Sequence, residues 1–223
     1  MVRISSFSLK KRKSPFGSVS VTFILILINV IAFIFFATLL ALDVLSLDSI
    51  ALKPSNITQG KYLWTFVTSM FMHGGLFHIF ANMFSLLFIG SLVERLLGAK
   101  RYFYFYMISG LLAGVFFVLS SLIFTGDFNT FAVGASGALF GIVGLLVLLT
   151  PNLPVYIFFI PIPVKMKYAG IGILVVLWFI SIAGDVPIGN TAHLGGFVVG
   201  IVYGLYLKNK FPNKTRMISR HFR

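Results

Sequence analysis

The sequence predicts an all-α membrane protein with six spanning helices, on the evidence of its composition and charge pattern. Of the 223 residues, 58% are hydrophobic and 10% are charged, whereas about 25% are charged in a typical soluble domain. Charged residues divide the chain into six long uncharged runs, and each can hold the roughly 20 apolar residues of a spanning helix. This composition excludes a soluble enzyme and a disordered protein.

The uncharged runs favour helices over a membrane β-barrel. A barrel strand alternates apolar and polar residues, whereas these runs are apolar throughout, and a helix satisfies its own backbone hydrogen bonds in lipid. The runs comprise residues 14–42, 62–93, 102–126, 128–164, 168–184 and 186–207.

Two of the runs are longer than one span. In the second run, Gly74 and Gly75 indicate a loop, so we expect the second spanning helix to begin at about Leu76. In the fourth run, four prolines follow Thr150, and proline lacks the N–H that a helix interior needs. We therefore expect a fourth helix from about Ser136 to Thr150, and then a segment at the membrane interface, residues 155–160.

The basic residues predict the orientation of the chain. Lys and Arg accumulate in short cytoplasmic loops. With six spans and both termini in the cytoplasm, only Lys53 and Lys61 of the 18 basic residues fall outside. The formal charge of +13 is therefore explained by topology and requires no nucleic-acid partner.

The predicted organisation has three parts. Residues 1–17 form a basic cytoplasmic N-terminal tail, residues 18–207 a six-span domain, and residues 208–223 a basic cytoplasmic C-terminal tail that can contact anionic membrane lipids. Because we see no additional folded domain, we expect the cell membrane of a prokaryote as the location. The sequence does not predict an oligomeric state.

Three polar side chains are predicted to lie at one depth. His78, Ser136 and His193 fall near the starts of the second, fourth and sixth spans, which all run in the same direction. Polar groups within spans are costly and are functional hypotheses by default. The fourth helix, about 22 Å long, is shorter than a hydrocarbon core of about 30 Å, so Ser136 is expected to lie below the outer surface.

Ser136 is a candidate nucleophile. It lies in the sequence Gly134-Ala135-Ser136-Gly137, whose small residues permit a tight turn and a close approach by another backbone. At a helix N-terminus, the unpaired N–H groups and the positive end of the dipole suit a developing oxyanion. The alternative is an N-cap serine without a chemical role.

Small residues predict that the fourth and sixth spans are neighbours. Gly141 follows Gly137 at a spacing of four residues, and Gly200 follows Gly196 in the same way. This spacing lets helices pack closely in lipid. His193 would then lie beside Ser136 as a possible general base, and the loop from residue 184 to 190 is a candidate lid above both.

His78 and Asn82 are candidate oxyanion donors. They lie four residues apart and therefore share one helix face. A metal site formed by His73, His78 and His193 is the alternative. We disfavour it because the sequence has no in-span carboxylate at that depth and no H-E-x-x-H pattern.

Together these residues resemble the rhomboid family of intramembrane serine proteases over about residues 15–207. The motifs are His73-x4-His78-x3-Asn82, Gly134-Ala135-Ser136-Gly137 and Ala192-His193-Leu194-Gly195-Gly196-x3-Gly200. Their order and their placement on the second, fourth and sixth spans also match. The resemblance implies a rhomboid-like bundle whose first loop is associated with the membrane.

The resemblance also implies the chemistry and its site residues. Ser136 would be the nucleophile and His193 the general base of an endopeptidase, with oxyanion donors from His78, Asn82 and the Ser136 backbone N–H. The substrates would be the transmembrane segments of other proteins, and no cofactor or metal would be needed. Residues expected to support the structure are Trp64, His73, Glu94, Gly134, Gly137, Phe140, Gly196 and Gly200.

Two positions depart from the family pattern. Thr65 follows Trp64 where many members carry Arg, which affects the expected anchoring of the first loop. Phe140 stands where many members have Tyr, and its ring can stack on His193 but cannot donate a hydrogen bond to it.

Two other functions would also place polar residues inside membrane spans. A catalytically silent member would bind membrane-protein clients through the same fold, but such members normally lack the Ser or the His. A small transporter or channel would use its histidines as a proton relay, but it should show acidic partners in the spans and internal repeats, and the sequence has neither.

Overall fold

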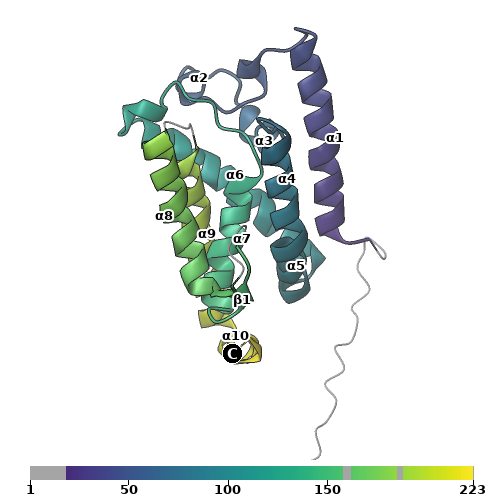
Figure 1. Cartoon of the computed structure of the whole chain (residues 1–223), viewed down its shortest axis with the longest axis vertical. Helices are drawn as coiled ribbons and strands as arrows, with labels where there is room; N and C mark the ends of the chain where they lie inside the picture. Colours follow the sequence, from purple (N-terminus) through teal and green to yellow (C-terminus); the bar gives the residue numbers. More distant parts are fainter. Residues whose placement is uncertain (1–18, 158–161, 185–187, 223) are drawn as a thin grey trace, which may run out of the picture.

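The computed structural model describes residues 19–157, 162–184 and 188–222 and is mostly helical (Figure 1). Its helices are α1 (Val21–Ala41), α2 (Pro54–Thr58), α3 (Thr65–Thr68), α4 (Leu76–Ser85), α5 (Ser91–Leu97), α6 (Ala99–Ser121), α7 (Ser136–Leu149), α8 (Met166–Gly184), α9 (Asn190–Lys210) and α10 (Pro212–His221). Leu86–Gly90 is a π-helical segment that joins α4 to α5. Leu47–Ser49 and Thr125–Asp127 form short 3-10 helices.

Four helices in the described part of the chain are long and apolar enough to cross a membrane. They are α1, the continuous helix Leu76–Leu97, α6 and α8. The shorter α7 has 14 residues and is also apolar. Its length of about 21 Å is less than the hydrocarbon core of about 30 Å, as expected for the fourth helix.

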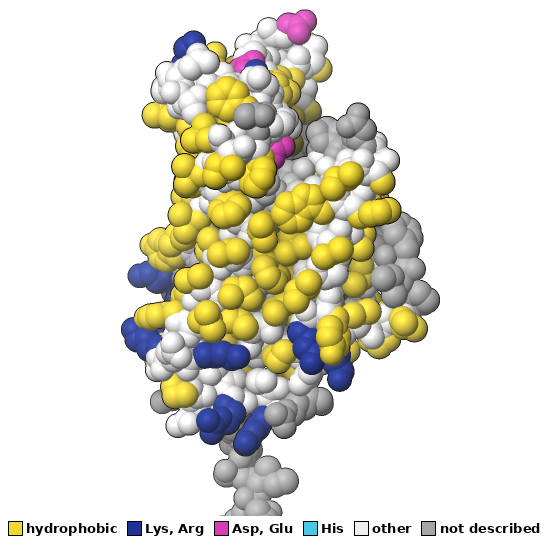
Figure 2. Space-filling model, turned by 90° about the vertical axis from the view of Figure 1, so that its left-hand side faces the viewer, with side chains coloured by type: hydrophobic (Ala, Val, Ile, Leu, Met, Phe, Trp, Pro, Cys, Tyr) yellow, Lys and Arg dark blue, Asp and Glu magenta, His cyan; other side chains and the backbone are white. Residues whose placement is uncertain are grey.

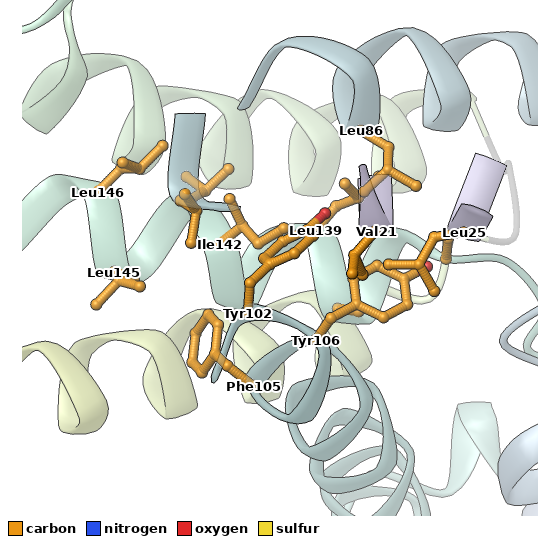
Figure 3. Packing of buried hydrophobic residues seen from close by; sticks show 14 of the residues in the cluster. Val21, Leu25, Leu86, Tyr102, Phe105, Tyr106, Leu139, Ile142, Leu145 and Leu146 are labelled. Carbon is orange, nitrogen blue, oxygen red and sulfur yellow. The ribbon is translucent and has the colours of Figure 1, made fainter. Parts of the chain in front are cut away.

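The helix α7 lies in the centre of the bundle, and α1 and α8 stand on opposite sides of it (Figure 1). Large side chains from four elements fill the space between α1, α6 and α7 (Figure 3). Tyr102 and Tyr106 of α6 pack with Leu25 of α1, with Leu86 of the π-helical segment and with Ile142 of α7. All five side chains are at most 1% exposed. The α7 side chains are thus surrounded by protein, whereas α1 presents most of its apolar surface outward.

The two ends of the bundle carry different charges. Figure 1 places α2 at the upper end and α10 at the lower end, which we call the α2 end and the α10 end. A band of hydrophobic side chains covers the middle of the face in Figure 2, and most Lys and Arg side chains lie below it. Lys53 and Lys61 flank α2. The segregation of charge expected from the sequence is present in the fold.

The first helix is held at its N-terminus by Glu94, a contact that the sequence does not reveal. The Glu94 carboxylate accepts hydrogen bonds from the backbone N–H groups of Val21 and Thr22, at 2.8 and 3.0 Å, and from the hydroxyls of Ser20 and Thr22, at 2.6 and 2.7 Å. The first N–H groups of a helix have no partner within it, and a negative charge there is favourable. Glu94 therefore ties α1 to α5.

Replacing Glu94 with glutamine is expected to destabilise the protein by about 1–3 kcal/mol, because the amide keeps only one acceptor oxygen and no charge. Thermal unfolding in detergent measures this. Asp48→Asn is the control: the Asp48 carboxylate accepts from Asn56 at 2.8 Å and lies 3.5 Å from Lys53, but this pair is at the surface, where such contacts contribute about 0–1 kcal/mol. Equal effects of the two substitutions would contradict the role of Glu94.

The segment between α1 and α4 is a folded layer at the α2 end. The Thr68 hydroxyl donates to the Ile50 carbonyl at 2.8 Å, and Leu52 pairs with Ala132 in an isolated β-bridge. The Ser55 N–H donates to the Phe128 carbonyl at 3.0 Å. These contacts attach the first loop to the chain that leads into α7.

Two helix starts agree with the sequence-based prediction. The starts of α4 at Leu76 and of α7 at Ser136 are confirmed. After α7 the chain forms an antiparallel pair of two-residue strands, β1 (Pro154–Val155) and β2 (Val164–Lys165). Much of the basic C-terminal segment is helical, since α9 continues to Lys210 and α10 follows.

Some expectations concern parts of the chain outside the described residues. These are the N-terminal tail, residues 1–17, most of the expected interface segment, residues 158–160, and the centre of the candidate lid, residues 185–187.

Candidate active site

The turn before α7 positions Ser136 as the first residue of that helix. Gly134 has a φ of +115°, a conformation that side chains other than glycine rarely adopt. A Cβ atom there would lie 2.8 Å from Nε2 of His78, so a larger residue would require the His78 ring to move. The Gly134 N–H donates to the Ser69 carbonyl at 2.8 Å. Ser69, which sequence reasoning missed, thus helps to fix the turn.

Ser136 and His193 form a hydrogen bond across α7 and α9. The Ser136 Oγ and His193 Nε2 atoms are 2.7 Å apart. Ser136 is half-buried, and His193 is 8% exposed. These two residues are 57 positions apart in the sequence. An accessible hydroxyl paired with a buried imidazole is the arrangement that activates a serine nucleophile.

Glycine contacts between α7 and α9 make this hydrogen bond possible. A Cβ atom at Gly196 would overlap the carbonyl oxygen of Gly137, and one at Gly200 would overlap the carbonyl oxygen of Gly141. The two backbones are therefore as close as glycine allows. The prediction that the fourth and sixth spans are neighbours is confirmed.

Phe140 packs against the face of the His193 ring. The ring centroids are 4.5 Å apart with an interplanar angle of 25°, which is a stacked pair. Phe140 lies four residues after Ser136 and therefore one turn further along the same face of α7. It is 7% exposed. The ring limits the orientation of His193 by contact, and the buried Nδ1 atom of His193 has no protein partner among the described residues.

The His78 ring lies next to Gly134 in the turn before α7. Its Nδ1 atom accepts a hydrogen bond from the Gly74 N–H at 3.3 Å. A neutral imidazole that accepts at Nδ1 carries its proton at Nε2. That Nε2 atom is the one that faces Gly134, so His78 presents a donor to the region beside Ser136.

Asn82 is buried one turn further along α4. Its Nδ2 atom donates to the His78 carbonyl at 2.8 Å, and its Oδ1 atom is buried without a partner in the described structure. One of the two Nδ2 hydrogens is therefore bonded to the helix backbone, and the other has no partner among the described residues.

His73 contacts the turn that precedes α7. Its Nε2 atom accepts from the Ala135 N–H at 3.5 Å, and its ring lies edge-on to that of His78 with centroids 5.2 Å apart. Burial, and next the electrostatic interaction with His78, lower the pKa of His73 to about 4. His73 is therefore neutral at neutral pH and can act as an acceptor.

The other two predicted support residues lie away from the Ser136–His193 pair. Trp64 donates its Nε1–H to the Ser49 carbonyl at 2.8 Å, while its ring is 57% exposed. It therefore braces the first loop. The next residue, Thr65, is buried and donates to the Tyr62 carbonyl at 2.7 Å. Glu94 holds the start of α1 at the α10 end, as described above.

The arrangement contains the parts of a serine nucleophile site: a hydroxyl at a helix N-terminus, a base within hydrogen-bond distance and a side-chain donor, His78, beside the turn. Across the residues that the structure describes, no group of three or more His, Cys, Asp or Glu could hold a metal ion. Nucleophilic acyl transfer is the chemistry that this geometry can support.

Comparison with known proteins identifies the family. Residues 60–210 match the Rhomboid domain. The chain is 38% identical to RHOMBOID-like protein 1 of Arabidopsis thaliana over 159 residues, which cover 69% of this chain and 37% of that protein. It is 30% identical to Rhomboid protein 1, mitochondrial, of Saccharomyces cerevisiae, with 67% and 43% covered.

A third relative bears on activity. The chain is 31% identical to Inactive RHOMBOID-like protein 8 of Arabidopsis thaliana, with 64% of this chain and 37% of that protein covered. The chain spans less than half the length of the curated relatives that it matches. The matched domain includes every residue of the site, and we conclude that the chain belongs to the rhomboid family and is an integral multi-pass membrane protein.

Proposed function

We propose that this protein is an intramembrane serine endopeptidase that hydrolyses peptide bonds in or near transmembrane segments of other membrane proteins. The observation that carries the proposal is the 2.7 Å contact between Ser136 Oγ and His193 Nε2. Family membership alone does not decide between an active and an inactive protein, because an inactive relative is also similar.

The chemistry follows from the roles of these two residues. Ser136 Oγ attacks the scissile carbonyl carbon while His193 Nε2 takes the hydroxyl proton. The tetrahedral intermediate then collapses, the C–N bond breaks, and His193 gives the proton to the leaving amine. Water deprotonated by His193 hydrolyses the acyl-enzyme, and the proton returns to Ser136.

Three donors stabilise the oxyanion of the intermediate. The Ser136 backbone N–H lies at the N-terminus of α7, where it has no partner within the helix. His78 presents Nε2–H beside the Gly134 turn, and Asn82 has one Nδ2 hydrogen that bonds to no described residue. Each donor removed from an oxyanion hole costs about 100- to 1,000-fold in kcat.

In this proposal the chain crosses the membrane six times, with both termini in the cytoplasm of a prokaryotic cell. The four long helices, the short α7 and α9 are the spans. The basic residues then lie mainly on the cytoplasmic side, and Ser136 is recessed from the outer surface. Substrates are helices containing small or helix-destabilising residues, because a regular helix hides its peptide bonds from a serine.

The alternative is a catalytically silent protein that binds membrane-protein clients. An inactive relative aligned over much of this chain keeps this alternative open. The hydrogen-bonded Ser136 and His193 favour the protease, since a binding protein has no need to retain both.

The test uses the purified full-length chain in liposomes with several transmembrane test substrates and a fluorophosphonate probe. A protease is expected to cleave a substrate and to be labelled at Ser136. The proposal fails if no substrate is cut and no label is attached while the protein is folded, as judged by a cooperative thermal transition.

Replacing Phe140 with leucine is expected to lower kcat about 2- to 10-fold with little change in KM, because it removes aromatic stacking worth about 0.5–1.5 kcal/mol from His193. The initial rate of substrate cleavage measures the effect. Phe117→Leu is the matched control, since Phe117 is fully buried in α6 but is not part of the site. An equal loss of activity in both variants would show a general packing effect.

A further inference from the structure

A groove of about 570 Å³ lies between α6 and α9, and neither Ser136 nor His193 is among its lining residues. Its walls include Tyr104 and Ile108 of α6 and Val202 and Tyr206 of α9. Each of these side chains is 48–59% exposed. The volume is within the range of about 300–1,000 Å³ that small-molecule sites occupy.

The groove is shaped for a flexible apolar chain and not for a helix. Phe105 stacks on Tyr203 with centroids 4.9 Å apart, and Tyr203 stacks on Tyr206 at 6.0 Å. These rings form part of the lining, and no residue of the lining is Gly, Ala, Ser or Thr. Helices that associate in lipid prefer small residues at the contact, as α7 and α9 do here. A substrate helix or a second copy is therefore a poor fit.

The end of the groove nearest α10 is basic. Arg101 lines the groove at the start of α6. Lys210, at the end of α9, places Nζ 2.7 Å from the hydroxyl of Tyr206, another lining residue. Glu94 is the one described acidic residue at the α10 end, and its carboxylate is occupied by the start of α1. Among the described residues, no other acidic side chain competes with an anion at the mouth of the groove.

We propose that the groove binds an anionic phospholipid, with an acyl chain along the aromatic lining and the headgroup phosphate between Arg101 and Lys210. Basic pockets between spanning helices on the cytoplasmic side are suited to anionic headgroups. The guanidinium of Arg101 can pair with two phosphate oxygens at once, while Lys210 provides a point charge. The site is separate from the proposed proteolysis and does not depend on it.

The test measures lipid binding to the full-length protein by native mass spectrometry from detergent. The probes are palmitoyl-oleoyl phosphatidylglycerol and phosphatidylcholine, which share acyl chains and differ in charge. Phosphatidylglycerol is expected to bind at least about fivefold more tightly, and Arg101→Gln is expected to weaken its binding about five- to tenfold, the scale of one net hydrogen bond. Lys100→Gln removes the same charge from a neighbour outside the groove and is expected to have little effect.

A second pair of variants tests the acyl-chain site. Val202→Trp fills the groove and should weaken both lipids, whereas Val175→Trp, at an exposed position on α8, should weaken neither. Thermal unfolding verifies that each variant is folded, and Arg101→Lys should keep part of the preference. Equal binding of both lipids to wild type and Arg101→Gln would overturn the proposal. If Val202→Trp binds both lipids normally but changes the particle mass, the groove binds a second copy of the chain and the proposal is wrong. If it binds both lipids normally but changes substrate cleavage, the groove binds a substrate and the proposal is also wrong.

Discussion

Replacing Ser136 with alanine is expected to reduce kcat by at least about 10,000-fold, and His193→Ala should have a similar effect. The two residues act as one unit, so the double variant should be no worse than either single variant. The residual rate would reflect binding and the oxyanion donors alone. Initial rates of cleavage of a transmembrane substrate in liposomes measure all three variants.

Controls separate loss of chemistry from loss of structure. Ser91→Ala changes a serine within the continuous helix Leu76–Leu97 that is not part of the site, and is expected to retain activity. Cleavage also requires a neutral His193, because a protonated imidazole cannot accept the Ser136 proton, so activity should fall as the pH becomes acidic. Cleavage that persists in Ser136→Ala would exclude Ser136 as the nucleophile.

Replacing Gly196 with alanine is expected to destabilise the protein by about 3 kcal/mol and to lower kcat about 100-fold. The new Cβ atom would overlap the carbonyl oxygen of Gly137, which belongs to the backbone and cannot move without shifting α7. Because Gly137 follows Ser136 directly, the shift would lengthen the contact between Ser136 and His193. Thermal unfolding and initial cleavage rates measure the two effects.

Gly172→Ala provides the matched control. Gly172 lies within α8, and a Cβ atom built there meets nothing within 4 Å. The same substitution should therefore leave activity unchanged and stabilise the helix by up to about 1 kcal/mol. If Gly196→Ala behaves in the same way, the close approach of α7 and α9 does not control the site.

The sequence was sufficient to predict boundaries of two helices that carry the site. The glycines before Leu76 and the prolines after Thr150 are local signals. The start of α4 follows from the glycines, and the end of α7 follows from the prolines. The neighbourhood of α7 and α9 was also predictable, because glycines at a spacing of four residues mark a helix face that permits close contact.

Other parts of the site depend on contacts between segments far apart in the chain. The Ser69 carbonyl that holds Gly134 lies 65 positions before it, and it has no motif to mark it. Glu94 reaches Ser20 across 74 positions. The family resemblance implied a structural role for Glu94 but did not identify the helix that it caps.

What the sequence determined by itself was therefore the membrane setting, the helices that carry the site and the residues able to do chemistry. Transfer of charged and apolar groups between water and lipid is a property of each residue, so it can be read along the chain. Only the tertiary structure decided the 2.7 Å approach of Ser136 to His193, the stacking of Phe140 on that imidazole and the groove beside Arg101. These features arise from helix packing, in which side chains distant in sequence meet at distances that no local pattern specifies.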